Sequence, residues 1–203
     1  MTRSPSSDAP GRGPDPGRRS ERSRRAILTA TRELVFEVGY PRLTIEAIAA
    51  RAGVGKQTIY RWWPSKGAVM FDALLHEARQ EGPALPDTGD LAADMRTVLR
   101  AIVDEFNDPV LDRMTRALGN EVNNDPRLAA DMLERLLGPQ LEATAERLRA
   151  AQRAGQAAPG VDLPAAVEMF YAPLFYRWML RTGPLTHAYA DTVTAMAVRA
   201  IAP

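Results

Sequence analysis

The chain has 203 residues, of which 45% are hydrophobic and 25% charged, as in an ordinary globular protein of one or two domains. It contains no cysteine, which excludes disulfides, thiolate nucleophiles and cysteine-based zinc sites. The longest apolar run, near residues 169–176, contains Pro173 and falls far short of the roughly 20 residues of a membrane span. The N-terminus lacks the apolar segment of a secretory signal, so we expect a cytoplasmic protein without a membrane partner.

The net charge of +1 conceals an asymmetry between the two parts of the chain. Residues 1–81 hold 14 basic and 9 acidic side chains, a net charge of +5, whereas residues 82–203 hold 12 and 16, a net charge of −4. A basic N-terminal part indicates a polyanionic partner. The acidic remainder argues against a chain that wraps such a partner along its whole length.

Residues 1–19 are rich in Pro, Gly, Ser and Arg, and we expect them to form a disordered basic tail. The tail could touch phosphates, although an inert tail is the simpler alternative. A first helix is predicted over residues 20–38, because its apolar residues recur on one face and Gly39 follows them. Pro41 then predicts a turn.

Residues 44–63 predict two short helices joined by a tight turn. Thr44 can cap the first helix, and Gly53 suits the left-handed residue that ends it. Gly55 can open the second helix, which carries polar groups on its first two turns, and Pro64 should end it. Two such helices form a helix-turn-helix, whose second helix enters the major groove of DNA.

The remaining start and stop signals predict further helices. Ser65 can cap a helix that runs to about residue 81 with Lys66 exposed in its first turn, and a Gly- and Pro-rich loop follows. Asp90, Asp108, Asp125 and Asp162 can each cap a later helix, and the third of these should kink at Gly138–Pro139. A last helix is expected over residues 186–201. Since no stretch alternates like a strand, the fold class is all-α with about nine helices.

The N-terminal part of the chain, over residues 22–81, resembles the DNA-binding domain of the tetracycline-repressor-like (TetR) family of bacterial regulators. The matching residues are Thr44, Ile48, Ala49, Ala52, Gly53, Val54, Thr58, Ile59, Tyr60, Trp63, Ser65, Lys66 and Gly67. One departure is Gly55, where many members carry a serine cap, so a hydroxyl that could reach a phosphate is absent. The remaining helices fit the family's layout by number and order.

This resemblance implies a domain organisation and a set of partners. Residues 20–66 would form the helix-turn-helix DNA-binding domain, 67–89 a connecting helix and linker, and 90–203 a ligand-binding and dimerisation domain. The chain would be a homodimer through its last two helices and would bind palindromic double-stranded operator DNA. An unknown small-molecule effector would bind in the second domain and change the spacing of the two recognition helices.

The expected DNA-binding residues surround the second helix of the motif. Lys56, Gln57 and Thr58 are expected to meet base edges, and Thr44, Tyr60 and Lys66 to hold phosphates. Further expected backbone contacts are Arg42, Arg61 and Trp62, with Gly55 as the cap, whereas Trp63 is expected to be buried. The alternative for each is an ordinary solvated cap, aromatic residue or cation.

For the effector site we look to large, flexible or aromatic residues of the second domain. The expected ligand-binding residues are Met95, Phe106, Met114, Met132, Phe170, Tyr171, Phe175 and Trp178. Such an interior suits a small apolar effector, although each residue could equally serve core packing.

Other functions find less support in the sequence. Residues 53–56 resemble part of a phosphate-binding loop, but that motif requires glycine where Ala50 stands and Ser or Thr where Gln57 stands. The two histidines, His76 and His187, form no zinc-binding pair, and the acidic residues near 104–112 fit a solvated face. We therefore expect no enzyme, no cofactor and no metal. The functional hypothesis is a dimeric DNA-binding transcriptional repressor released by a small apolar effector; the alternative is a helical ligand-binding or protein-interaction module without operator binding.

Overall fold

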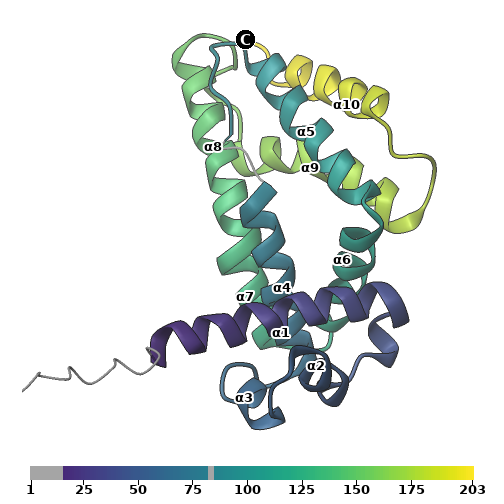
Figure 1. Ribbon diagram of the computed structural model, residues 1–203. Coiled ribbons are helices and arrows are strands. Elements are labelled where there is room, and N and C mark those ends of the chain that lie inside the picture. The colour runs from purple at the N-terminus through teal and green to yellow at the C-terminus, as the bar shows by residue number, and fades with distance from the viewer. Residues whose placement is uncertain (1–15, 82–84) are drawn as a thin grey trace, which may run out of the picture.

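The computed structural model describes residues 16–81 and 85–203, and over these residues every regular element is a helix (Figure 1). The N-terminal elements are α1 (Pro16–Val38), the 3-10 turn η1 (Tyr40–Arg42), α2 (Ile45–Ala52), α3 (Lys56–Tyr60) and α4 (Lys66–Glu81). The C-terminal elements are α5 (Leu91–Asn107), α6 (Pro109–Val122), α7 (Pro126–Met132), the π-helical turn η2 (Leu133–Leu137), α8 (Gly138–Arg153), α9 (Leu163–Leu180) and α10 (His187–Ala200).

The all-α fold class is confirmed. Because α7, η2 and α8 follow one another without a break, they form one long rod, and the described residues then contain the nine helices that the sequence predicts. The predicted tail lies for the most part outside the described residues. Where the two overlap the prediction was wrong, since α1 begins at Pro16 rather than Ser20; proline is favoured in the first turn of a helix, where its missing amide is not needed.

The aspartate caps confirm the predicted helix starts. Asp90 accepts from the amide of Ala93 at 3.0 Å, and Asp108 accepts from two amides of the first turn of α6. Asp125 and Asp162 cap α7 and α9 in the same way. Each carboxylate satisfies amides that have no partner within the helix, which is why these helices begin where the sequence indicates.

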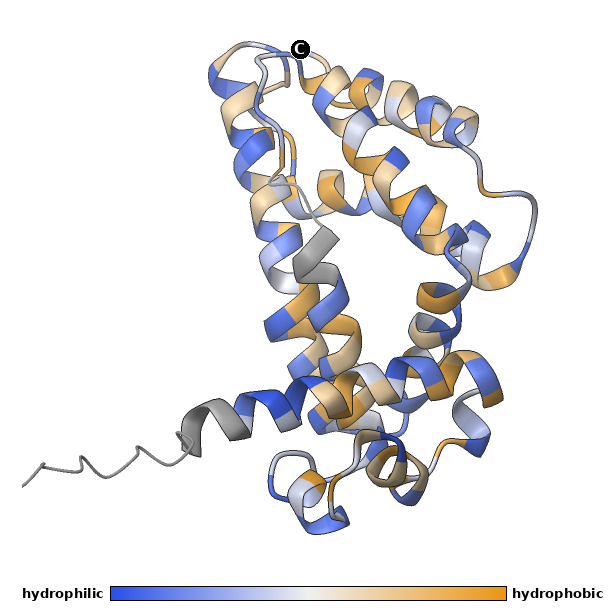
Figure 2. Cartoon of the chain, in the orientation of Figure 1, coloured by the Kyte–Doolittle hydropathy of each residue, from blue (hydrophilic) through white to orange (hydrophobic). Residues whose placement is uncertain are grey.

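The described residues form two apolar cores. The first is built by α1–α4 together with residues of α6 and α7, namely Leu111, Met114, Leu118 and Leu128. The second is built mainly by α5, α8, α9 and α10 (Figure 2). The helix-turn-helix therefore does not rest on the N-terminal helices alone, because α6 and α7 pack against the same core.

A kink is predicted at Gly138–Pro139, and these two residues directly follow the π turn η2. In an α-helix the amide of residue 139 would donate to the carbonyl of Arg135, but proline has no such amide. The chain instead makes the wider π turn, in which the amide of Gly138 donates to the carbonyl of Leu133. A Cβ at position 138 would lie only 2.7 Å from that carbonyl oxygen, so this turn requires glycine.

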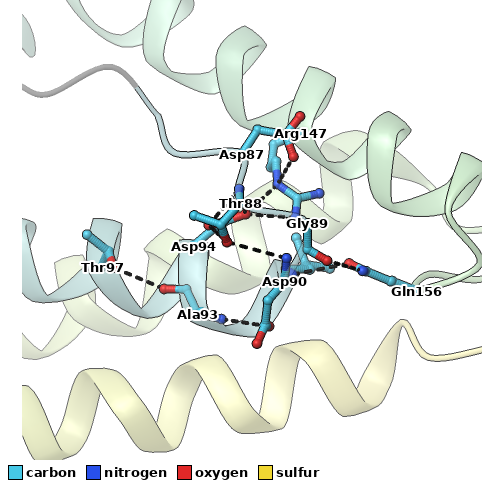
Figure 3. A network of polar contacts seen from close by, with 10 residues as sticks. Asp87, Thr88, Gly89, Asp90, Ala93, Asp94, Thr97, Arg147 and Gln156 are labelled. Carbon is cyan, nitrogen blue, oxygen red and sulfur yellow. Dashed lines mark hydrogen bonds and ion pairs between the residues drawn. The ribbon is translucent and has the colours of Figure 1, made fainter.

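A buried ion pair fixes the segment that leads into α5 (Figure 3). Asp94 on α5 and Arg147 on α8 are almost fully buried, and Nη2 of Arg147 lies 2.7 Å from Oδ2 of Asp94. The Thr88 hydroxyl donates to Asp94 at 2.7 Å, and Gln156 accepts from the amide of Leu91 at 3.1 Å. These contacts hold residues 87–91 against α8 and the segment that follows it.

Candidate DNA-binding site

The helix-turn-helix is formed by α2, a three-residue turn and α3. The Thr44 hydroxyl caps α2 by accepting from the amide of Ala47 at 3.1 Å, as the sequence predicts. Gly53 ends α2 in the left-handed conformation, with φ of 66°, and its amide donates to carbonyls of the last turn. Ile45, Ile48 and Ala49 of α2 and Ile59 of α3 are buried in the first core, which anchors both helices.

The second helix of the motif is shorter than expected. Gly55 opens it in extended conformation without a side-chain cap, but the helix ends at Tyr60 instead of reaching Pro64. The amides of Trp62 and Trp63 both donate to the carbonyl of Ile59, which turns the chain. This turn carries Trp63 into the core, where it is 4% exposed, and confirms the prediction that it is the buried tryptophan.

The outer face of α3 presents polar side chains to solvent. Lys56, Gln57, Tyr60 and Arg61 are exposed, whereas Thr58 is half-buried. A shallow depression is lined by Gln57, Thr58, Tyr60 and Arg61. Among the residues expected to read bases from the first turns of a recognition helix, the structure exposes Lys56 and Gln57 and leaves Thr58 half-buried beside them.

Lys56 is joined to the first turn of α2. Its ammonium lies 3.0 Å from Oε1 of Glu46, and both side chains remain more than half exposed. The hydrogen bond from Lys56 lowers the pKa of Glu46, and the same contact raises the pKa of Lys56. The pair places a carboxylate next to the lysine that is expected to read a base, a neighbour that the sequence analysis missed.

The expected phosphate anchors are distributed around the motif. Thr44 and Arg42 are exposed, although Nε of Arg42 also donates to the carbonyl of Val38 at 2.9 Å. Trp62 is half-buried, meets Trp63 edge to face at 5.3 Å between ring centroids, and lies beneath the Arg61 guanidinium.

Lys66 differs from the expectation of an exposed lysine. It is half-buried, and its ammonium donates to the carbonyls of Tyr40 and Leu43, each at 3.3 Å. The ammonium also lies 4.3 Å from the centroid of the Tyr40 ring. The carbonyls of Tyr40 and Leu43, at the two ends of η1, provide acceptors for the cation, which is the physical reason that it turns inward. Burial, reinforced by the Glu121 carboxylate, raises the pKa of the Tyr40 phenol.

Asp72 forms a polar centre that the sequence analysis missed. Its Oδ2 accepts from Nε1 of Trp63 at 2.9 Å and from Arg24 at 3.1 Å, and its Oδ1 accepts from Arg135 at 2.6 Å. Burial would raise the pKa of Asp72, but the hydrogen bonds from Trp63, Arg135 and Arg24 outweigh it and hold the pKa below its usual value. A single acidic residue within the apolar stripe of α4 is the signal that could have revealed this centre.

The eight expected ligand-binding residues fall into three places. Met95, Phe170 and Tyr171 belong to or pack against the second core, whereas Met114 and Met132 belong to or pack against the first. Phe106 stacks on Trp178 at 4.5 Å between ring centroids, and Phe175 lies 5.6 Å from Trp178. Phe106 and Phe175 thus each contact Trp178, and these three residues form one aromatic cluster.

Two structural features bear on other expected functions. None of the helices in residues 16–81 and 85–203 combines the length and the apolar character needed to cross a membrane. Within the same residues, no three histidine or acidic side chains gather closely enough to hold a metal ion.

This fold and this exposed recognition helix define a helix-turn-helix DNA-binding protein with a helical C-terminal region. Family comparisons agree: residues 27–73 match the bacterial regulatory proteins of the tetR family, and residues 85–197 match the tetracyclin repressor-like C-terminal domain. The chain belongs to the TetR family of transcriptional regulators.

Relatives resemble the chain over most of its length. An uncharacterized HTH-type transcriptional regulator, YdeS of Bacillus subtilis, is 28% identical over 183 residues, 90% of this chain and 91% of the relative. The Mycobacterium tuberculosis regulator Rv2250c is 32% identical over 66% of this chain and 69% of its own. The crystal structure of the TetR family regulator SCO0332 superimposes with a TM-score of 0.73 at 31% identity, covering 89% of this chain and 99% of the other.

Proposed function

We propose that this transcriptional regulator is a dimeric repressor that binds a palindromic operator and is released by a small apolar effector. The observation that carries the proposal is the exposed first turn of α3, with Lys56 and Gln57 directed to solvent while Ile59 anchors the helix in the core. Lys suits guanine and Gln suits adenine in the major groove. Thr44, Arg42 and Tyr60 surround this turn and supply groups for phosphates.

The proposed dimer interface is formed by α9 and α10. These helices expose large apolar side chains: Met169 at 41%, Tyr176 at 58%, Leu180 at 58% and Met196 at 65%. Such side chains gathered on neighbouring helices favour burial against a second copy of the chain. A two-fold axis between two copies would present two α3 helices to DNA, and hence favours a palindromic operator.

The proposed effector is apolar because methionine and aromatic side chains, among them Met95, Phe170 and Trp178, are buried in the C-terminal region. Phe106 is half-buried and Phe175 is 46% exposed, so the cluster around Trp178 has the accessible side chains that a ligand could contact. We propose that the protein acts in the cytoplasm and catalyses no reaction. Mass spectrometry of small molecules that co-purify with the protein tests the proposed effector site. Phe106→Ala should reduce the amount of ligand that stays bound during purification.

The experiment that tests operator binding is a gel-shift assay with the DNA upstream of the chain's own gene, followed by selection from a random-sequence library. We expect one palindromic sequence to be enriched and to be bound by two chains. Failure to enrich any sequence, by a folded protein, would instead favour the module that does not bind an operator.

The dimer interface is tested by light scattering of two matched variants. Leu180 on α9 and Leu133 on η2 are both 58% exposed. Leu180→Glu should yield monomers with weak operator affinity, whereas Leu133→Glu should remain a dimer. Dimers of both variants would contradict the proposed interface.

A further inference from the structure

Asp72 lies at the junction between the recognition helix and the C-terminal region. It projects from α4 and accepts hydrogen bonds from α1 through Arg24, from the end of the helix-turn-helix through Trp63, and from η2 through Arg135. Trp63 lies three residues after the end of α3, and its amide donates to the carbonyl of Ile59 within α3. Asp72 is therefore joined to α3 through the buried side chain of Trp63.

Arg135 is the contribution of the C-terminal region to this centre. Its guanidinium donates to Oδ1 of Asp72 at 2.6 Å and lies 5.1 Å from the centroid of the Phe71 ring. A charge-assisted hydrogen bond is more directional than the apolar contacts around it. The apolar core thus holds α4 against α7, while Arg135 specifies how the two are aligned; in Figure 1 these helices run side by side above α1.

The direction of Arg135 depends on the π turn in which it lies. Gly138 permits that turn, because a Cβ at 138 would meet the carbonyl of Leu133, and Pro139 favours it, because proline cannot donate to the carbonyl of Arg135. If η2 became regular α-helix, Arg135 would be rotated about the helix axis relative to α8, because an α turn holds fewer residues than a π turn. The hydrogen bond from Arg135 to Asp72 thus depends on Gly138 and Pro139, which have no other evident role in the described residues.

We propose that Arg135 and Asp72 are positioning residues that fix the orientation of the helix-turn-helix relative to the C-terminal region and thereby set the half-site spacing of the operator. This inference rests on the proposed palindrome-binding dimer, because half-site spacing has meaning only for two joined copies. A change of one base pair in a spacer moves a half-site by about 3.4 Å and rotates it by about 35°. Only a rigidly oriented pair of recognition helices rejects such a change.

The test uses the operator selected by the wild-type protein and a series of duplexes whose spacer is longer or shorter by one base pair. Arg135→Gln keeps much of the side-chain length but removes the charge. We expect discrimination between the selected spacer and its neighbours to fall by about 2- to 30-fold, the range for residues that couple two sites. The bases preferred within each half-site should be unchanged.

A matched control is Arg149→Gln on α8, since Arg149 also forms ion pairs and is 39% exposed against 37% for Arg135. The control should keep wild-type discrimination. Pro139→Ala provides a second variant that leaves the ion-pair residues intact; its restored amide favours the α register and should relax spacing in the same way. In an Asp72→Asn background, Arg135→Gln should add little, because the two residues act through one contact.

The outcomes separate the two levels of the proposal. If the wild-type protein enriches no palindrome or is a monomer, the proposed function fails and the inference falls with it. If the wild-type dimer binds its palindrome but Arg135→Gln and Pro139→Ala both keep the spacing preference, the positioning role alone is overturned. Altered base preference with unchanged spacing would overturn it as well.

Discussion

The ammonium of Lys56 lies 3.0 Å from Oε1 of Glu46, so the first residue of α3 is joined to the first turn of α2 on the exposed face of the helix-turn-helix. The lysine is attractive to DNA and the carboxylate repels it. When the protein binds DNA, Lys56 can keep its contact with Glu46, which then orients it, or it can break this contact. The two possibilities give different results on substitution.

Lys56→Ala should lower operator affinity by roughly 5- to 150-fold and relax preference at one base position, as expected for a base-reading lysine. Glu46→Gln should raise affinity for all DNA, because a negative charge leaves the face that meets the phosphates. If Glu46 orients Lys56, Glu46→Gln should also relax the preference at the same base position. Fluorescence anisotropy with a panel of single-base operator variants measures both effects.

The matched control for Glu46→Gln is Glu33→Gln. Glu33 also pairs with a basic residue, Arg51, and is 44% exposed, but it lies on α1. This variant should leave base preference intact. An unchanged footprint and affinity for Lys56→Ala would remove Lys56 from the base-reading residues.

Lys66→Met tests whether the inward-turned lysine also holds a phosphate. The variant loses the two contacts to the carbonyls of Tyr40 and Leu43, and we expect the free energy of unfolding to fall by about 1 kcal/mol. If Lys66 also neutralises a phosphate, the slope of log affinity against log salt should flatten by about 0.9 per contact, for all sequences alike. Thermal unfolding and salt titrations measure the two effects; lower stability with an unchanged slope would restrict Lys66 to the η1 carbonyls.

Arg147→Met should destabilise the C-terminal region, because it leaves the buried Asp94 carboxylate without its cation. We expect a loss of about 3 kcal/mol at pH 7, at the low end for a broken buried pair, since the Thr88 hydroxyl and amide still donate to Asp94. Denaturant unfolding measures this loss, with Arg149→Met on the same helix as the exposed control.

The same pair predicts a pH dependence. Burial would raise the pKa of Asp94, but hydrogen bonds from Thr88 and Arg147 outweigh it and lower the pKa. A lowered pKa contributes stability that is complete above the unfolded value of about 3.9 and is lost as the pH falls through the folded value. The difference between wild-type and Arg147→Met should therefore shrink below about pH 4. A constant difference from pH 7 to pH 3 would contradict this linkage.

Gly55→Ser should increase the stability of the helix-turn-helix and its affinity for DNA. Gly55 has φ of −76° and ψ of 148°, and a Cβ there would meet nothing within 4 Å. A serine hydroxyl can cap α3, so stability should rise by a few tenths of a kcal/mol, and a hydroxyl near the phosphates should raise affinity for DNA. Gly53→Ser is the contrasting variant: its φ of 66° would strain serine, and stability should fall. Weaker binding by a stable Gly55→Ser would show that a bare backbone is needed at this cap.

Local signals determined most of the helices. Asp90, Asp108, Asp125 and Asp162 cap the helices that the sequence places after them, and Gly53 ends α2 in the left-handed conformation. Such signals work from sequence because a cap and the amides that it satisfies lie within three residues of each other. The early end of α3 escaped prediction because it depends on the burial of Trp63 beside Asp72, a contact between separate elements.

The sequence by itself determined the class of protein, through the helix-turn-helix pattern of residues 44–63 and the polar first turn of its second helix, because both are encoded in neighbouring residues. Only the tertiary structure decided that Lys66 turns inward to Tyr40 and that Asp72 gathers Arg24, Trp63 and Arg135. A charged side chain takes its partner from whatever the packed helices bring within about 3 Å. For Asp72 those partners lie 9 to 63 residues away in the chain. Over such separations a sequence pattern does not show which residues will lie next to each other.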